Sequence, residues 1–568
     1  MNRFKEKIIK MKIRLLLPFG SLNRIKGYFF LYILYSFVYN NTKCSIKIVR
    51  ARGSSKMGKT KWIVGMIALV AIALGMAGCS SEKKAADKSF VYAMQADARN
   101  LDPHMSTDAP SAAATSKKVY EGLVTIDKDN KLVALLATEW KQIDPLTLEM
   151  TLRKGVKFHD GTDFNAEAVK INFDRLLDPG TKRNRRAILS AIKEVKVVAP
   201  DKVQIITEQP SPSLLLHLTH SAGFIMSPAA IAADAKGEKA LAQNPVGTGP
   251  FVFTEWKKGD QIILTRNGNY WGKKPEIAKL ILKVVPEDVT RVAMVRTGEA
   301  QAADQAPVTE VDKLSQDPKV TLLRTPVYRS EFISFNTEKG PFSNPKVRKA
   351  VATAIDYDGL IKGVYNGVGK PSVSSIGPQV FGHNPNLKPY VKNLEEAKKM
   401  MAEAGMPNGF KATLYVPDRK VRVKMAEVVQ AQLKPLGIEV EIKTMEFGAY
   451  LKATEEGQQD FCIDGWSNQT GDADFCMTTV FGTNGIKTGQ NIARYSNPKV
   501  DELLATARIE MNPQKREKMY QEIQEILRED VPIIVTQIGE DLTITGKNIS
   551  GLWVGSGGGA VFNDVVFK

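Results

Sequence analysis

Histidine and cysteine are the residues to inspect first for catalysis or metal binding, and this 568-residue chain has few of either. Its five histidines are His104, His159, His217, His220 and His383. His217 and His220 could share a helical face, but no third ligand is recognisable, and SLLLHLTHSAG is typical of an apolar helix with two polar interruptions. His159 lies in a predicted turn, where a packed or solvated histidine is expected. We predict no metal site.

A nucleophile with its base is also missing from the sequence. No Gly-x-Ser-x-Gly elbow follows a predicted strand, and no paired Cys/His site is present. Of the four cysteines, Cys462 and Cys476 could pair in an oxidising compartment or remain separate thiols, and their spacing does not decide between the two. We predict no catalytic residue and no cofactor.

Cys79 has a different chemistry, because it follows a signal-like segment. Lys59 and Lys61 precede an apolar run, 62–76, which ends in small residues directly before Cys79. The run is shorter than the ~20 residues of a membrane span. We predict a lipoprotein signal peptide over 57–78, lipidation of Cys79 and a polar linker over 79–89. The alternative is a cleaved soluble export signal with an incidental cysteine.

Residues 1–56 differ in composition from the rest. They carry thirteen Lys and Arg against one acidic residue, Glu6, and so contribute +12 of the net charge of +18. Lys59 and Lys61 add two more, which leaves +4 from Cys79 onward. We expect an over-extended start, with translation beginning at Met57; the alternative is a real basic leader. The remaining charge gives no reason to expect a nucleic-acid partner.

The chain beyond the linker is long enough for two or three packed domains. Strand 90–95 is followed by the string TLEMTLRKGVKFHDGTDFNAEAVKINFDRLLDP, residues 147–179, in which Asn165 is expected to cap a helix over 166–177. This string resembles the signature region of the family 5 extracellular solute-binding proteins of ABC importers, which bind peptides, dipeptides, glutathione or nickel. The stretch PVGTGPF, 245–251, is similar to the same family, and its glycines are expected to serve close backbone turns.

The resemblance implies an α/β fold of the type II periplasmic-binding-protein class, with two lobes joined by a hinge. We place lobe I at 90–335, with an extra subdomain at about 120–245, lobe II at 336–537, and a return to lobe I at 538–568. In lobe II, strand 410–416, helix 421–433 and strand 438–442 predict a parallel β-α-β unit. Asn344, Asn393, Asn497 and Asn512 are placed to begin helices.

The same resemblance implies the ligand site. The stretch CIDGWSNQTGDADF, 462–475, is similar to a family segment in which an aspartate holds the ligand's α-ammonium; Asp472 is the first choice and Asp474 the second. Gly465 and Trp466 of this stretch would line the pocket. Alternatively, both aspartates cap the following helix and Trp466 is a core residue.

For the ligand's carboxylate, the segment DRKVR, 418–422, resembles the family's place for a binding arginine. Arg419 is the first choice and Arg422 the second, and the alternative is a solvated basic surface. The implied protein is a lipid-anchored, exported, monomeric receptor, periplasmic or on the outer face of the cytoplasmic membrane. It would bind a dipeptide, oligopeptide or glutathione and deliver it to an ABC permease. The alternative is an exported cell-surface hydrolase acting on peptides or glycans.

Overall fold

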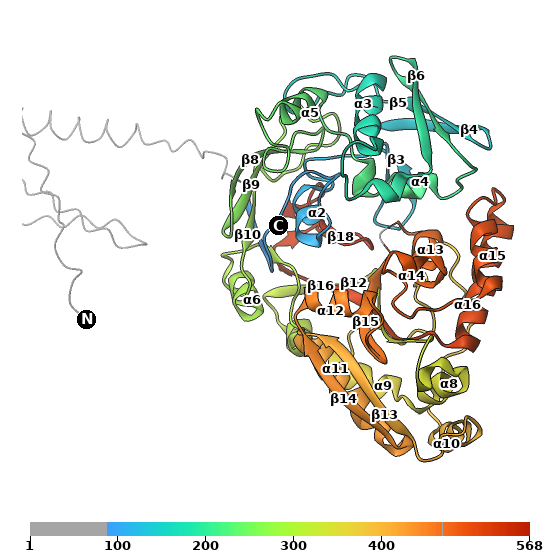
Figure 1. The fold of residues 1–568 in the computed structure, drawn as a ribbon. Coiled ribbons are helices and arrows are strands. Elements are labelled where there is room, and N and C mark those ends of the chain that lie inside the picture. The colour runs from blue at the N-terminus through green and yellow to red at the C-terminus, as the bar shows by residue number, and fades with distance from the viewer. Residues whose placement is uncertain (1–87, 469) are drawn as a thin grey trace, which may run out of the picture. The chain divides into compact units, whose positions relative to one another are not determined.

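A computed structural model describes residues 88–468 and 470–568 (Figure 1). Within the compact unit 83–568, one large sheet runs through the molecule. Its ten strands, in spatial order, are β14 (Ile438–Met445), β13 (Phe410–Pro417), β15 (Phe461–Ser467), β12 (Val320–Phe335), β16 (Ile533–Gly546), β11 (Ala302–Ala303), β1 (Ser89–Met94), β10 (Lys279–Val284), β9 (Gln261–Arg266) and β8 (Phe251–Lys257).

The two long strands β12 and β16 join the halves of this sheet. They pair antiparallel from Val320 to Ser334, with register shifts between Pro326 and Ser330 and again after Glu331. Strands β13, β14 and β15 lie on one side of this pair, and β1 and β8 to β11 lie on the other. The sheet is therefore mixed and continuous between the two lobes.

The predicted β-α-β unit of lobe II is confirmed. Helix α11 (Lys420–Leu433) connects β13 to β14, and these strands pair in parallel with Phe410 opposite Ile438. Lobe II also contains α8 (Pro345–Ala354), α9 (Tyr357–Tyr365), α10 (Leu394–Glu403), α12 (Phe447–Glu455), α13 (Ala473–Phe481), α14 (Asn484–Lys487), α15 (Pro498–Ala507) and α16 (Pro513–Asp530).

The predicted helix caps are found at the predicted residues. The side chains of Asn344, Asn393, Asn497 and Asn512 each accept a backbone N–H in the first turn of α8, α10, α15 and α16. Asn165 does the same for α3 (Ala166–Leu177). Each cap satisfies a donor that the helix itself leaves without a partner.

The predicted extra subdomain contains a second sheet, with strand order β4 (Ala137–Asp144), β5 (Thr147–Leu152), β7 (Lys202–Thr207) and β6 (Ile192–Ala199). Helix α3 contacts β6 and β7, and this part of the chain has its own apolar core. The helix expected around His217 and His220 is shorter than the pattern indicates. Helix α4 covers Leu214–His217, and a 3₁₀ turn, Ser221–Gly223, follows, with His220 as its N-cap.

The other elements of lobe I are short. The helices are α2 (Ala109–Thr115), α5 (Pro228–Ala235), α6 (Asp288–Thr297) and α7 (Val311–Gln316). The hairpins are β2 (Val124–Ile126) with β3 (Leu132–Ala134), β17 (Ile549–Ser550) with β20 (Val566–Phe567), and β18 (Trp553–Val554) with β19 (Ala560–Val561). Apolar residues of the C-terminal segment, between Ile549 and Val565, pack in the same buried cluster as Phe90 and Tyr92.

Two glycines are needed for a close backbone crossing in lobe I. A Cβ on Gly247 would lie 2.1 Å from the carbonyl oxygen of Val119, and one on Gly249 would lie 2.3 Å from that of Lys118. His159 accepts the N–H of Gly247 at Nδ1 (3.4 Å), and its Nε2 lies 2.9 Å from the oxygen of Gly249. The glycines therefore serve close packing of backbone, as predicted, and His159 fixes this crossing.

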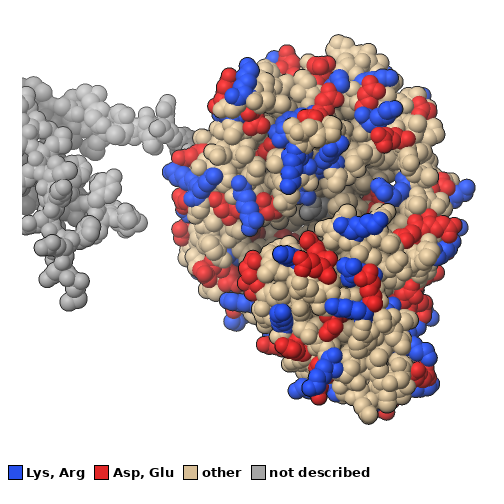
Figure 2. All heavy atoms as spheres, viewed as in Figure 1, with Lys and Arg blue, Asp and Glu red and all other residues tan. Residues whose placement is uncertain are grey.

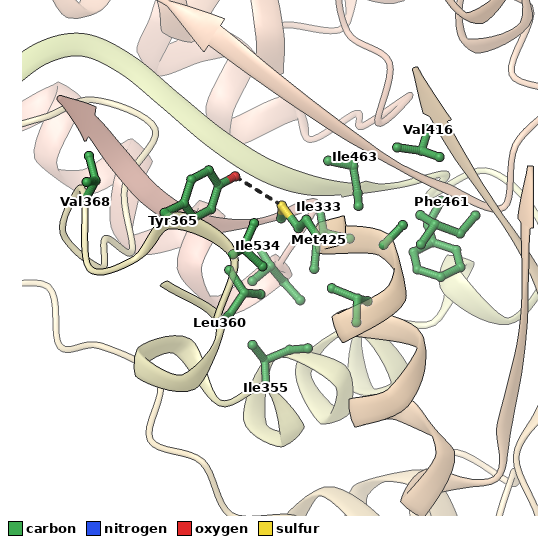
Figure 3. Close-up of a cluster of buried hydrophobic side chains, with 14 of the residues drawn as sticks. Ile333, Ile355, Leu360, Tyr365, Val368, Val416, Met425, Phe461, Ile463 and Ile534 are labelled. Atoms are coloured by element: carbon green, nitrogen blue, oxygen red, sulfur yellow. Dashed lines mark hydrogen bonds between the residues drawn. The ribbon is translucent and has the colours of Figure 1, made fainter. Parts of the chain in front are cut away.

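The largest apolar cluster lies along the joined sheet and the helices of lobe II. Figure 3 shows Ile333 of β12 and Ile463 of β15 beside Met425 of α11, with the Tyr365 hydroxyl 3.5 Å from the Met425 sulfur. Ile333 and Ile463 are register partners and both are fully buried. Burial of apolar surface stabilises the folded protein by ~25 cal/mol per Å² removed from water. The hinge strands are therefore part of the core.

Candidate functional site

A cavity of about 350 Å³ lies where the two lobes meet the hinge strands. Lobe I supplies α2 and the residues after it, the ends of β1 and β11, and the loop 554–561. The hinge supplies Val327–Arg329, Glu540 and Asp541, and lobe II supplies Ser467 and Thr470. Figure 2 shows a hollow in this face of the molecule, with charged side chains of both signs around it. The volume is in the range of small-ligand sites.

One wall of the cavity carries two lysines. The Lys118 ammonium is buried, donates to the carbonyl oxygens of Ala560 (2.8 Å) and Ser116 (3.3 Å), and lies 5.1 Å from the ring centre of Phe562. The Lys117 ammonium donates to the oxygen of Ile126 at 2.7 Å. Burial lowers the pKa of Lys118 to about 7 and that of Lys117 to about 8. Carbonyl oxygens partly compensate these cations, and an anion in the cavity would stabilise their charge further.

The hinge side of the cavity carries two carboxylates, Asp304 after β11 and Asp541 on β16. Oδ1 of Asp304 accepts the N–H of Gln95 at 2.8 Å, and Oδ1 of Asp541 accepts the Thr543 hydroxyl at 2.8 Å. Burial, together with the negative charge of Asp541, raises the pKa of Asp304 to about 7, although Arg291 opposes the shift. Burial also raises the pKa of Asp541. A cation between them would lower both values.

A glycine-rich loop forms the C-terminal wall of the cavity. Gly558 and Gly559 have φ of 89° and 88°, which side chains rarely allow. In the same loop, Ser556 accepts the Tyr328 N–H at its carbonyl oxygen (2.9 Å) and donates its hydroxyl to Asn130 Oδ1 (2.7 Å). The Tyr328 hydroxyl also lies 3.4 Å from Asn130 Oδ1. This loop connects the hinge strand β12 with the turn between β2 and β3.

The first sequence-predicted anchor, Asp472, lies at the start of α13 and does not line the cavity. Its carboxylate accepts two hydrogen bonds from the Arg516 guanidinium, at 2.6 and 2.7 Å, and also caps α13 through the N–H of Asp474. Asp472 and Arg516 are 1% and 3% exposed. In this conformation the carboxylate is fully engaged within lobe II, as the helix-cap alternative anticipated.

Asp474 lies at a contact between the lobes. Its carboxylate accepts hydrogen bonds from the Thr478 hydroxyl (3.1 Å) and from the Ser213 hydroxyl of lobe I (3.4 Å). The Arg508 guanidinium is 3.3 Å away. Burial lowers the pKa of the neighbouring His217, while the negative charge of Asp474 opposes that shift. Asp474 therefore links α13 to the subdomain beside the cavity.

The two arginine candidates are placed differently from each other. Arg419 is exposed at the start of α11, with its guanidinium carbon 4.7 Å from the Phe447 ring centre. Arg422 is buried and donates to Glu331 at 3.1 Å and to Asp464 at 3.0 Å. Neither side chain lines the cavity. The Arg422 charge is balanced by Glu331 on β12 and Asp464 on β15, so Arg422 ties α11 to these two strands.

Trp466 and Gly465 do not line the cavity either. The Trp466 ring packs on Phe475 at 5.8 Å, and its buried Nε1 has no hydrogen-bond partner among the described residues. A Cβ on Gly465 would lie 2.8 Å from Nη2 of Arg422, so glycine leaves room for that side chain. Their segment does reach the cavity through the neighbouring Ser467 and Thr470.

Cys462 and Cys476 are buried free thiols, so of the two alternatives left by the sequence, a disulfide or separate thiols, the structure has separate thiols. The described part of the chain contains no group of three or more His, Cys, Asp or Glu arranged to hold a metal ion. Among residues 88–468 and 470–568, no helix is both long and apolar enough to cross a membrane. Cys79, the predicted signal 57–78 and most of the linker lie outside the described residues.

Sequence reasoning did not find the residues that line the cavity. Lys117 and Lys118 follow a short helix, and Asp304 follows a strand of two residues. Such short elements leave no periodic pattern from which the position of these side chains could be predicted. The signal that was available is the run GSGGGA at 555–560, because so many glycines indicate an unusual backbone path.

The architecture and the cavity define a class: a two-lobed, type II periplasmic-binding-protein-like α/β fold with a binding space at the junction of the lobes. The family described as bacterial extracellular solute-binding proteins, family 5, matches residues 131–488. This chain belongs to that family and is a solute-binding protein of the ABC-importer class, not an enzyme.

Similar proteins cover almost the whole folded unit. The glutathione-binding protein GsiB of Escherichia coli O1:K1 is 33% identical over 510 residues, which are 88% of this chain and 98% of the relative. The structure of the ABC transporter-associated periplasmic binding protein DppA from Helicobacter pylori with the peptide STSA is 30% identical, with a TM-score of 0.73 over 84% and 98% of the chains. The dipeptide-binding protein of Pseudoalteromonas sp. SM9913 with Met-Leu is 25% identical, with a TM-score of 0.74 over 84% and 100%.

Proposed function

We propose that this protein is a lipid-anchored receptor that binds a peptide-like solute between its lobes and delivers it to an ABC permease. The observation that carries the proposal is the cavity of about 350 Å³, lined by both lobes and by the hinge strands. Ligand contacts with both lobes favour the closed arrangement, and the permease would distinguish the closed from the open form. Relatives named for glutathione and structures holding peptides support this solute class.

Cys79 is the proposed site of the anchor, and the mature protein would act as a monomer outside the cytoplasm. Acyl chains contribute about 0.8 kcal/mol per buried methylene, so two or more chains would hold the protein on a membrane durably. Labelling cells with a fatty acid should label the native protein, and Cys79→Ala should abolish the label. An unlabelled native protein would contradict the anchor while leaving the binding proposal intact.

Titration calorimetry with glutathione, Ala-Ala and Ala-Ala-Ala would test binding. We expect saturable binding of at least one of them at one site per chain, with the solute recovered intact by mass spectrometry. Turnover would instead support a hydrolase acting on peptides. If none of the three binds, native mass spectrometry of the protein as purified should reveal a different retained solute, and the peptide-like class would be wrong.

The predicted anchors Asp472 and Arg419 remain part of this proposal only as positions to test. The contact between Asp472 and Arg516 favours a structural role for that aspartate. Arg419 is exposed, so it would have to reach a ligand that extends beyond the cavity.

A further inference from the structure

A buried contact joins the two lobes beside the cavity, where α4 of lobe I meets α13 of lobe II (Figure 1). The Ser213 hydroxyl donates to Oδ2 of Asp474 at 3.4 Å, and the two residues are 2% and 6% exposed. Neither residue lines the cavity, although nearby residues of both segments do: 219–221 in lobe I, and Ser467 and Thr470 in lobe II. The contact is therefore adjacent to the solute space without being part of it.

Ser213 directs its hydroxyl to the other lobe and not to its own helix. It is the N-cap of α4, where a serine side chain commonly accepts a backbone N–H, yet it makes no such bond. In α13 the cap is Asp472, so the Asp474 carboxylate can take a hydroxyl from each lobe, Ser213 and Thr478. Neither helix depends on the bond between the lobes for its cap.

An aromatic side chain of lobe II extends the contact. Phe475 follows Asp474 in α13 and packs against the apolar core of the lobe I subdomain, a cluster that includes Leu214 and Leu218. Within lobe II, the Trp466 ring centre lies 5.8 Å from that of Phe475. Separation of the lobes would return apolar surface of Phe475 to water, which is unfavourable. The contact therefore favours closure whether or not the cavity holds a solute.

The contact also covers a histidine of lobe I. His217 of α4 is 8% exposed, and its buried Nε2 has no hydrogen-bond partner among the described residues. Burial lowers the pKa of His217. Four charged groups of lobe II also act on this pKa: Asp474 and Asp472 raise it, and Arg516 and Arg508 lower it. The imidazole therefore faces lobe II, and separation of the lobes would expose it to solvent.

We infer that this contact, the α4–α13 latch formed by Ser213, His217, Asp474 and Phe475, holds the lobes together in the empty protein and sets how much of it is closed before a solute arrives. The inference goes beyond the proposed function, in which the solute itself favours closure, and rests on that function only for its effect on affinity. A closed empty form raises the affinity, since less of the binding free energy is used to close the lobes. It also slows solute entry and release, because both require the lobes to separate.

His217 makes the α4–α13 latch measurable in the full chain without a solute. The protein is unfolded, dialysed and refolded to remove any retained solute, and is then treated with diethyl pyrocarbonate, which modifies accessible imidazoles. Peptide mapping by mass spectrometry gives the rate at each histidine. In the native empty protein we expect His217 to react about tenfold or more slowly than in the denatured chain.

His104 is the internal reference for unfolding. Its Nε2 is also buried and has no partner among the described residues, but the charged groups that act on its pKa, which burial lowers, lie in lobe I: Asp102, Arg175 and Arg183. Separation of the lobes should leave His104 protected, whereas unfolding should expose both histidines.

Ser213→Ala removes one hydroxyl and no cap bond, so it weakens the α4–α13 latch with little other change. We expect His217 to react about three- to tenfold faster in this variant, as the loss of one hydrogen bond between the lobes predicts, with His104 still protected. Thr478→Val is the matched control. It removes the other hydroxyl that donates to Asp474, but this bond lies within lobe II, so His217 should react at the native rate.

Fast modification of His217 in the native empty protein, slowed only by Ala-Ala-Ala or glutathione, would overturn the inference and leave the proposed function in place. An unchanged rate in Ser213→Ala would overturn it as well. A protected His217 in a protein that binds none of the peptides would support the α4–α13 latch while the proposed function fails. If Ser213→Ala also exposes His104, the variant unfolds, and Phe475→Leu replaces it with the same expectation.

Where a solute binds, the α4–α13 latch also has a kinetic effect. Ser213→Ala should release Ala-Ala-Ala about three- to tenfold faster in stopped-flow measurements, although Ser213 does not line the cavity. Thr478→Val should release it at the native rate. Release at the native rate from Ser213→Ala would contradict a latch that must open before the solute can leave.

Discussion

The guanidinium of Arg516 on α16 binds both carboxylate oxygens of Asp472 at the start of α13, and both side chains are almost completely buried. The guanidinium also lies 4.9 Å from the ring centre of Phe381 and 5.0 Å from that of Tyr520. This ion pair holds two helices of lobe II together. The Asp472 carboxylate, which the family resemblance assigned to the ligand's ammonium, is therefore bound to Arg516 in this structure.

Asp472→Ala should therefore lower the free energy of unfolding by about 3–5 kcal/mol, because it leaves a buried guanidinium without its partner. Urea denaturation would measure the change. Asp163→Ala, which breaks the exposed pair with Lys157, should cost less than about 1 kcal/mol. A variant at Asp472 with native stability and lost peptide binding would restore the ligand role and contradict this interpretation.

The glycine at 247 should not tolerate a side chain. Gly247→Ala places a methyl group 2.1 Å from a backbone oxygen, so the two crossing segments must separate, and we expect the free energy of unfolding to fall by about 1–3 kcal/mol. Gly268→Ala is the control, because nothing lies within 4 Å of its added Cβ. Thermal unfolding of both variants would check the difference, and equal Tm values would refute the close approach.

Lys118 should make stability rise with pH. Its pKa is about 7 in the folded protein and about 10.4 when unfolded, so between these values the unfolded chain binds more protons. The free energy of unfolding should increase from pH 7 to pH 10 with a slope of up to about 1.4 kcal/mol per pH unit from this group. Denaturation at several pH values would show this slope.

Lys118→Met should flatten that part of the profile and stabilise the protein at pH 7. The exposed Lys411, which pairs with Glu439, provides a control at Lys411→Met. An unchanged pH profile in Lys118→Met would mean that the ammonium is solvated and would contradict its burial.

Cys462 and Cys476 should resist alkylation in the native protein. Both thiols are buried, and burial raises the pKa of each, so the reactive thiolate is scarce. Iodoacetamide treatment followed by peptide mapping should find both positions unmodified before denaturation and modified after it. A disulfide-linked peptide containing both residues would contradict the free thiols.

The sequence was most informative where structure is local. Asn165, Asn344 and Asn393 cap helices at the predicted positions because a cap depends on residues two or three apart. The parallel β-α-β unit around α11 followed from periodicity in one continuous stretch. These features need no knowledge of the rest of the chain.

The cavity could not be predicted in the same way. Asp304 and Asp541 become neighbours only because β11 pairs with β16, more than two hundred residues later in the chain. Arg516 likewise reaches Asp472 from 44 residues away. A short motif identifies the segment near the site, but partners brought in from distant elements decide whether its charged groups face a ligand or each other.

The break in register between Pro326 and Ser330 has a mechanical result. Val327 to Arg329 stand outside the ladder between β12 and β16, so bending at this point leaves the ladder intact on either side. At this break Tyr328 donates its N–H to the carbonyl oxygen of Ser556 and accepts the N–H of Asn468, so both the C-terminal segment and lobe II hold it. A bend of the two long strands at this point would therefore disturb contacts made by the C-terminal segment as well as by lobe II.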